Sequence, residues 1–448
     1  MRKIGLAVAA GMLAAPLALV AQTAPAPAPV PLTLSRAVSI AADTAPSVRI
    51  AELRTEETQQ RFRQARSVLL PNLSASASEV NRTFNRSTFG ITFPTLPGAP
   101  ESPDRVGPFT VFDARFTLRQ TLFDPSGWVR TQAAKQAMTA AQADQETAAE
   151  TVAQRAGLAY VRATRAEAVR QARLEDLVLA DSLLSLARTQ LQAGVSAAID
   201  VTRAEAQRVA AEGLVQVASN QAQQAQIELA RALAVDPGTR FALSDGLTPQ
   251  TAASDAPVEM AVAVQRALER RPDLRAEQLR QRAARTAVRS IRAEALPRVD
   301  VIADYGASGR SPGDAISTRE LGLQVSLPLL DGMRREARQA EQVAMAREST
   351  VREGDIRQQV AAEVDAALLE LRSGLEQQTV AAERMRLAQQ ELSQARERFR
   401  EGVAGNIEVI NAQSSLIRAE DAVIDARYAT AVARVNLARA VGVTQTLR

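Results

Sequence analysis

Two very long stretches without proline dominate the sequence. The first follows Pro125 and ends at Gln192, and the second runs from Met333 to Arg400; both are rich in Ala, Gln, Arg, Glu and Leu. These residue types favour helix, and about 67 helical residues rising 1.5 Å each make a rod of roughly 100 Å. Such a rod is several times longer than a small domain is wide. We therefore predict two helical rods rather than a conventional globular core.

Each rod belongs to one copy of an internal duplication. Pro46 and Pro71 recur 226 residues later as Pro272 and Pro297. The segment Leu122-Phe-Asp-Pro125 likewise matches Leu329-Leu-Asp-Gly332. Similar segments that recur in the same order indicate a repeated structural unit. Each half is therefore predicted to run helix, strand, strand, very long helix, tip, helix.

The predicted segments follow from hydrophobic periodicity and from turn residues. The first repeat is assigned to 34–257: a helix, strands at about 72–82 and 109–123, a long helix 126–192, a tip 193–198, a helix 199–235 and a connector 236–257. The second is assigned to 258–448: a helix, strands at about 298–307 and 318–329, a long helix 332–400, a tip 401–406, a helix 407–442 and a C-terminal tail. Pro46 and Pro272 are each predicted to lie inside the opening helix of their repeat.

The four strands have the length and alternation of membrane-spanning strands. In the clearest one, Leu321, Leu323 and Val325 alternate with polar or small residues. In lipid, only a closed barrel leaves no strand edge unpaired, and four strands are too few to close one around a lumen. Two copies would give eight strands with a filled interior, whereas three would give twelve with room for a channel. If the strands span a membrane, several copies must share one barrel.

The N-terminus predicts export. Arg2 and Lys3 precede an apolar run and small residues, so we predict a signal peptide over 1–23, followed by a Pro/Ala-rich tether over 24–33. A membrane anchor is the alternative, but Pro16 interrupts the run. The chain has no Cys and no His, which excludes thiol chemistry, disulfides, Cys/His zinc sites and imidazole catalysis. We expect no cofactor and no metal.

The charge pattern argues against nucleic acid as a partner. The formal net charge is +4, but acidic residues are interleaved with the arginines along the helical patterns. No basic block or RNA-binding signature interrupts this mixture. The arginines are therefore interpreted as parts of solvated helix faces.

The sequence resembles the TolC-type outer-membrane efflux family over nearly the whole mature chain. The resemblance is carried by the two Leu-Pro junctions, by both tips, and by Gln120-Thr-Leu-Phe-Asp-Pro-Ser-Gly-Trp128 and Gly322-Leu-Gln-Val-Ser-Leu-Pro328. It implies a mixed α and β fold: a homotrimeric 12-stranded transmembrane β-barrel, with four strands per chain, continued by a periplasmic α-helical coiled-coil tunnel. The implied location is the bacterial outer membrane, and the implied role is transport rather than catalysis.

The same resemblance implies partners and substrates. The tunnel would dock to a periplasmic adaptor protein and to an inner-membrane RND or ABC transporter, while the barrel contacts outer-membrane lipid. Substrates in the family include drugs, metal ions and, for type I secretion members, proteins. The duct would be passive, because specificity and energy come from the partners.

The tips carry the candidate site residues. Gly194-Val195 and Gly402-Val403 are the predicted adaptor-docking tips. In the family, polar contacts and rings of acids close the periplasmic aperture, and the resemblance matches Asp200 and Glu408 to such acids. Phe399 matches an aromatic position of the family, and Asn411 matches the position of a second acid. Ala404 stands where the family has a gating arginine, so Arg203 and Arg400 are its possible substitutes.

Alternative interpretations remain for these features. Asp200 and Glu408 also suit helix N-termini, where the helix dipole stabilises an acid by about 0.3–1 kcal/mol. Trp128 and Phe123 fit either an aromatic belt at a membrane interface or simple packing. A secreted coiled-coil scaffold without a pore is the alternative function. A carboxylate-based enzyme is a further alternative, but it leaves the ordered repetition of strands and tips unexplained.

Overall fold

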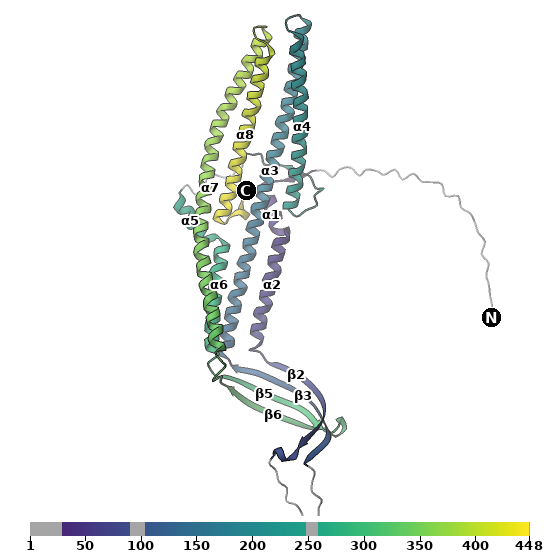
Figure 1. Cartoon of the computed structure of the whole chain (residues 1–448), viewed down its shortest axis with the longest axis vertical. Coiled ribbons are helices and arrows are strands. Elements are labelled where there is room, and N and C mark those ends of the chain that lie inside the picture. Colours follow the sequence, from purple (N-terminus) through teal and green to yellow (C-terminus); the bar gives the residue numbers. More distant parts are fainter. Residues whose placement is uncertain (1–28, 90–103, 248–258, 448) are drawn as a thin grey trace, which may run out of the picture.

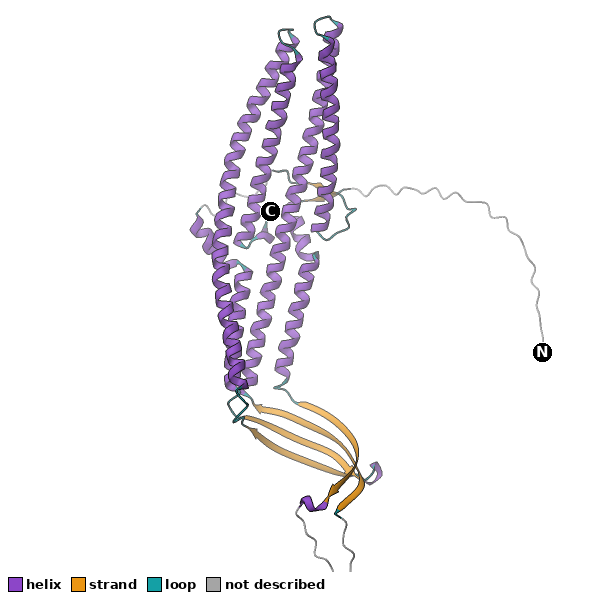
Figure 2. Cartoon of the chain, in the orientation of Figure 1, coloured by secondary structure: helices purple, strands orange, loops and turns teal. Residues whose placement is uncertain are grey.

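The protein is a long helical rod that ends in a curved β-sheet (Figure 1). The structure, a computed structural model, describes residues 29–89, 104–247 and 259–447. The predicted signal peptide, the tether up to residue 28 and the connector from residue 248 to 257 lie outside these ranges. Figure 2 separates the two parts, with helices in the rod and long strands in the sheet, which is four-stranded. No helix within the described ranges combines the length and the apolar character that a bilayer crossing requires.

The helices repeat in the same order in both halves. The first half contains α1 (Leu34–Thr44), α2 (Pro46–Ser67), α3 (Pro125–Gln192) and α4 (Ala198–Ala232). The second contains α5 (Met260–Arg270), α6 (Pro272–Ala293), α7 (Arg334–Arg400) and α8 (Asn406–Val441). Three short 3-10 helices are η1 (Arg86–Phe89), η2 (Pro312–Asp314) and η3 (Thr444–Thr446). The long helices α3 and α7 run the length of the rod, with α4 and α8 folded back on them.

The opening helix of each repeat is broken at its proline. The expectation of one continuous helix through Pro46 and through Pro272 is wrong, because each proline begins a second helix, α2 or α6. The preceding residues, Ala45 and Arg271, have extended backbone with ψ of 132° and 120°. A proline ring disfavours helical backbone at the residue before it and suits the first position of a new helix.

The large sheet joins the two repeats. Its strands are β2 (Asn72–Asn85), β3 (Arg105–Phe123), β5 (Arg298–Gly309) and β6 (Ile316–Ser326), all antiparallel, in the order β2-β3-β5-β6. The central pair, β3 and β5, brings Phe116 opposite Tyr305. β6 ends at Ser326, before the predicted limit of 329, and Pro328 has no N–H with which to continue a ladder. Thus β2 and β6 form the two edges.

A second, two-stranded sheet lies half-way along the rod. β1 (Val30–Leu32) pairs in parallel with β4 (Phe241–Leu243), within the segments predicted as a tether and a connector. The side chain of Leu32 is buried in the core between α1, α3 and α4. The Tyr160 hydroxyl donates to the Leu32 main-chain oxygen over 3.1 Å. Burial and this hydrogen bond hold the end of the tether in place.

Candidate functional site: the hairpin tips

Both tips lie at the end of the rod farthest from the sheet (Figure 1). In each tip the glycine after the long helix has left-handed backbone, with φ of 71° at Gly194 and 72° at Gly402. The next N–H reaches back to the last helical turn: Val195 donates to Gln190 over 3.0 Å, and Val403 donates to Arg398 over 2.9 Å. A non-glycine residue would be strained there. The two Gly-Val breaks are therefore equivalent helix terminators.

The two tips touch each other. A Cβ atom added to Gly402 would lie 3.3 Å from Cγ1 of Val195. Val195 and Val403 are both exposed. The end of the rod thus presents two apolar side chains to solvent.

Two buried amide hydrogen bonds join the hairpins just behind the tips. The side-chain nitrogen of Asn406, on α8, donates to the main-chain oxygen of Asp200, on α4, over 2.7 Å. The side-chain nitrogen of Gln190, on α3, donates to the main-chain oxygen of Phe399, on α7, over 2.8 Å. The bonds are reciprocal, because each hairpin supplies one amide and one main-chain acceptor. Buried bonds of this kind fix the relative position of the hairpins.

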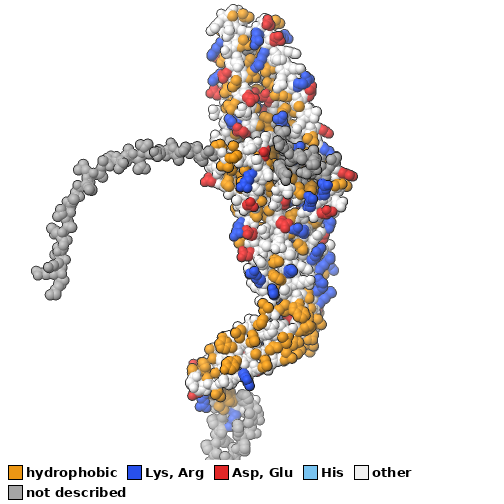
Figure 3. Space-filling view, turned by 180° about the vertical axis from the view of Figure 1, so that it is seen from behind, with side chains coloured by type: hydrophobic (Ala, Val, Ile, Leu, Met, Phe, Trp, Pro, Cys, Tyr) orange, Lys and Arg blue, Asp and Glu red, His pale blue; other side chains and the backbone are white. Residues whose placement is uncertain are grey.

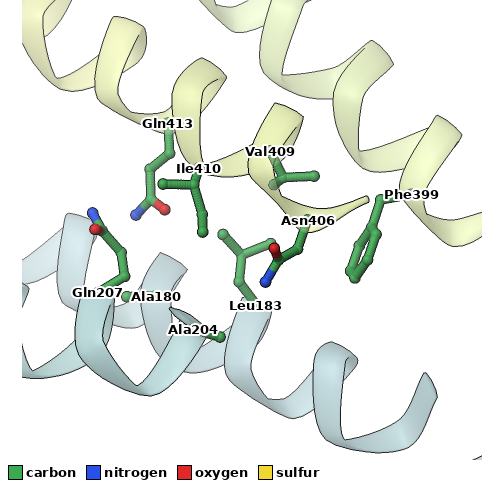
Figure 4. A pocket seen from close by; sticks show the side chains of 9 residues that line it. All are labelled: Ala180, Leu183, Ala204, Gln207, Phe399, Asn406, Val409, Ile410 and Gln413. Carbon is green, nitrogen blue, oxygen red and sulfur yellow. The ribbon is translucent and has the colours of Figure 1, made fainter. Parts of the chain in front are cut away.

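A cavity of about 10 Å³ lies between the hairpins next to these bonds (Figure 4). It has room for about one water molecule. Its polar lining comes from Asn406, Gln207 and Gln413. Gln413 is 0% exposed, and neither polar atom of its side chain has a protein partner in the described part of the chain. The seam between the hairpins is thus polar but incompletely paired at this point.

The interior of the α7/α8 hairpin is apolar, and Leu179, Leu183 and Leu186 of α3 pack against it across the seam. Between α7 and α8 the buried side chains are apolar and form one cluster. It comprises Ala388, Leu392, Ala395, Phe399, Val409, Ala412, Leu416 and Ala419. Apolar packing holds the hairpin α7/α8 together, whereas amide bonds contribute to the contact between the hairpins.

The two predicted acids lie in different environments. Asp200 is buried in the first turn of α4, with Arg203 3.6 Å from its carboxylate. Glu408 lies in the first turn of α8, its side chain is 44% exposed, and its partner is Arg398 at 3.4 Å. Both positions suit a negative charge at a helix N-terminus. Of the two, Glu408 is the carboxylate that solvent reaches more readily.

The remaining candidates are separated. The ring of Phe399 is buried in the α7/α8 cluster, so its main-chain oxygen rather than its ring makes the contact with the other hairpin. Asn411 and Arg400 are exposed. The structure thus brings Arg203 to Asp200 but leaves Arg400 and Asn411 on the surface of the α7/α8 hairpin.

A charged cluster lies farther along the α3–α8 seam. Arg173 forms ion pairs with Asp176, at 2.8 Å, and with Asp421. Arg173 and Asp176 are buried. Burial raises the pKa of Asp176. Burial also raises the pKa of Glu420 to about 7, helped by the negative charges of Asp176 and Glu175.

The polar side chains of the seam were not among the sequence candidates, although one of them, Gln413, has a local signal; Asp200 and Phe399 were candidates, but they contribute main-chain oxygens to the seam bonds. Gln413 lies three residues before Leu416 and four after Val409, so an amide interrupts the apolar stripe of α8. A polar residue at a core position of a helix indicates a buried polar contact. Gln190 has no such signal, because its partner Phe399 is more than 200 residues away, and Arg173 has a local partner in Asp176 but a distant one in Asp421.

No three acidic side chains in the described ranges converge as ligands of a metal ion would. The described part of the chain thus combines long helices and a strand sheet with a partly polar seam and two tips.

The comparisons agree on the architecture. The model of the family described as "Outer membrane efflux protein" matches residues 37–235 and 263–443. No individual curated protein matches the sequence significantly. A membrane protein from Pseudomonas aeruginosa has a similar structure, with a TM-score of 0.77, 22% identity and coverage of 91% of this chain and 93% of its own.

Two further solved structures share the fold. The outer membrane protein VceC from Vibrio cholerae has a TM-score of 0.74 and 19% identity, covering 91% of this chain and 96% of its own. CusC, studied for folding and transmembrane channel formation, has a TM-score of 0.74 and 19% identity, covering 91% of both chains. The family match includes both repeats, and its members are channels of the outer membrane rather than enzymes. The chain belongs to the outer membrane efflux protein family.

Proposed function

We propose that three copies of this chain form a passive exit duct across the outer membrane and periplasm. The observation that carries the proposal is the open sheet. One face of the sheet exposes large apolar side chains, among them Tyr305, Phe116 and Leu321, the last of which is 80% exposed. The opposite face carries polar residues such as Thr117, which donates a hydrogen bond to Asp304. This division suits lipid on one side and a water-filled lumen on the other.

Closure of the barrel requires other copies of the chain. β2 and β6 are the two edges, and each has a strand partner on one side only. An unpaired edge in lipid costs several kcal/mol for each unsatisfied backbone group. Three copies supply twelve strands, the smallest of the symmetric options that leaves a lumen wide enough for a channel. The helical rods then continue the lumen as a tunnel in the periplasm.

The periplasmic end is the proposed gate and docking end. Glu408 contributes the exposed acid of an aperture ring, with Asp200 and Asn411 behind it. Arg203 and Arg400 serve as the gating arginines. The exposed Val195 and Val403, on the glycine breaks, form the surface for a periplasmic adaptor. These roles are supported by the tip geometry and by the polar seam between the hairpins.

The duct receives its substrate from other proteins. We propose an adaptor and an inner-membrane transporter of the RND or ABC class as partners. The transported class is drugs, metal ions or, in type I secretion, proteins. Co-purification of the crosslinked protein from its native host identifies the transporter class. Recovery without any adaptor or transporter contradicts this part of the proposal.

Disulfide crosslinking tests the shared barrel, because the chain has no native Cys. Ser74→Cys on β2 is combined in turn with Thr318→Cys, Glu320→Cys or Gln324→Cys on β6. All four positions alternate with the exposed apolar residues. Oxidation of membranes is expected to yield covalent dimers and trimers in at least one register, because a disulfide forms only when the two Cα atoms lie within about 7 Å.

Single-cysteine variants are the controls, since one cysteine cannot link three chains. Monomers in every register would contradict the shared barrel. Extraction of the protein from membranes without detergent would instead favour the secreted scaffold.

A further inference from the structure

A groove between α6 and α7 carries four arginines. Arg285, Arg289 and Arg292 line it from α6, and Arg347 lines it from α7. The groove measures about 440 Å³. The rest of its lining is mostly apolar and comes from Val288, Val343, Ala346 and Thr350. The groove therefore combines positive charge at its rim with an apolar floor.

The four guanidinium groups have no acidic partner in the described ranges. Nearby arginines differ: Arg280 pairs with Asp144, and Arg338 lies 2.9 Å from Glu294. For the three arginines of α6 the sequence gives a reason: α6 has no acid between Glu277 and its end, and Glu294, directly after it, pairs with Arg130 and Arg338. Like charges gathered around one groove repel one another and attract an anion.

The groove lies beside the apolar sheet. α6 ends at Ala293, and β5 begins at Arg298. Arg292 is thus in the last helical turn before the sheet, and Arg285 lies about 10 Å farther along the helix. Figure 3 shows Lys and Arg side chains gathered on the helices next to the apolar sheet, on the same side of the molecule.

Apolar residues mark the boundary between sheet and rod. Trp128, in the first turn of α3, packs edge-to-face on Phe123, with ring centroids 5.5 Å apart. Both rings are exposed, as are Leu329 and Leu330 after β6. Exposed aromatic rings at the end of membrane strands are typical of the level of lipid headgroups. The arginine groove begins at this level.

A neighbouring copy of the chain does not supply the missing negative charge. α2 packs on α3, α3 on α6 and α6 on α7, so α2 and α7 are the edges of this helix layer. In a ring of copies, α2 of one copy meets α7 of the next. The last turns of α2 carry Arg61, Arg63 and Arg66 and no acid after Glu57, which pairs with Arg61 and leaves Arg63 and Arg66 as the added charges. The neighbour therefore adds positive charge near the sheet.

We propose that the α6–α7 groove binds the headgroup of an anionic phospholipid from the periplasmic leaflet of the membrane. The arginines contact the phosphate oxygens, and the apolar floor contacts the carbon atoms next to them. Guanidinium groups suit phosphate because they donate two parallel hydrogen bonds. The proposal rests on the sheet spanning the membrane, and it makes each lipid a fixed part of the junction between barrel and rod.

Native mass spectrometry of the full protein in detergent tests the site. The probes are phosphatidylglycerol, phosphatidylcholine and inorganic phosphate, added at equal concentrations. Retention of phosphatidylglycerol in preference to both other probes is expected. The triple variant Arg285→Gln/Arg289→Gln/Arg292→Gln should bind phosphatidylglycerol on the order of a hundredfold more weakly, at about 1 kcal/mol per arginine.

A charge-matched control variant is Arg384→Gln/Arg386→Gln/Arg418→Gln, in the α7/α8 hairpin, which should bind as the unmodified protein does. Equal retention of phosphatidylcholine, competition by inorganic phosphate, or equal losses in both variants would each overturn the lipid site. If the groove variant alone lost the trimer mass, the groove would be a contact between copies of the chain. That result would also overturn the lipid site.

The same spectra report the number of chains per particle. A trimer without bound phosphatidylglycerol overturns the lipid site but leaves the proposal of a trimeric duct intact. Monomers that still retain the lipid contradict the trimeric duct while supporting the site.

Discussion

The side-chain nitrogen of Asn406 lies 2.7 Å from the main-chain oxygen of Asp200, and this bond crosses from one hairpin to the other. Together with the bond from Gln190 to Phe399, it holds the tips side by side. Any outward movement of one hairpin at this end must break both bonds. In the proposed duct, we therefore expect the seam to restrain opening of the periplasmic end.

Replacing Asn406 with Ala should favour the open end of the duct. Loss of one buried hydrogen bond costs about 1 kcal/mol, enough to change the ratio of open to closed forms about fivefold. We expect a higher mean conductance of the reconstituted channel in planar bilayers. Gln389→Ala, an exposed position in the α7/α8 hairpin, is the control. Identical conductance in the two variants would mean that the bond does not restrain the end.

Replacing Glu408 with Gln should reduce cation selectivity. Its carboxylate is exposed at the tip, and three copies would place three negative charges around the aperture. The measurement is the reversal potential in a salt gradient, together with block by a divalent cation. Glu376→Gln, about 36 Å from the end of α7, removes an equal charge away from the tip. Equal effects of both changes would count against an acidic ring.

Replacing Glu420 with Gln should make stability less dependent on pH. The pKa of Glu420 is raised from 4.5 to about 7, so the folded protein holds a proton that the unfolded chain releases. Its contribution is therefore greatest at low pH and is lost as pH rises from about 4.5 to about 7. We expect the variant to be more stable at pH 8 by on the order of 2 kcal/mol.

Thermal unfolding of the detergent-solubilised protein between pH 5 and pH 8 measures this effect. A residual slope is expected from Asp176, whose pKa burial also raises. Parallel pH profiles for the variant and the unmodified protein would refute the assignment to Glu420.

Replacing Gln413 with Leu should stabilise the protein. An unpaired buried polar group costs about 1–3 kcal/mol, and Leu has a similar size without that cost. The expected result is a higher unfolding temperature. Gln413→Ala removes the same amide but leaves a larger cavity, so it should gain less or lose stability. A lower unfolding temperature for the Leu variant would indicate that the amide is paired.

The sequence was sufficient for the fold class, because the elements that define it are long and periodic. The repeated order of helices and strands follows from two patterns, one of about 3.6 residues and one of two. The predicted helix at 126–192 compares with α3 at Pro125–Gln192. The helical break at Pro272 could have been predicted as well, although it was not, because proline disfavours helical backbone at the preceding residue.

Contacts between distant residues were beyond sequence reasoning. The bond between Asn406 and Asp200 joins residues 206 positions apart, and no local sequence pattern predicts such a partner. The same holds for Arg173 and Asp421. The strands β1 and β4 have three residues each, too few to display a period. Local periodicity specifies elements, whereas the seam depends on how those elements meet.

The pairing of β1 with β4 has a consequence for assembly. Val30 lies just before the first repeat and Phe241 near its end, yet their backbones must meet in register. The chain must therefore close a loop of more than 200 residues before this pair can form. Closing so long a loop is slow, so the first repeat is completed late. We therefore expect the pairing of β1 with β4 to be among the last contacts to form in the first half of the chain.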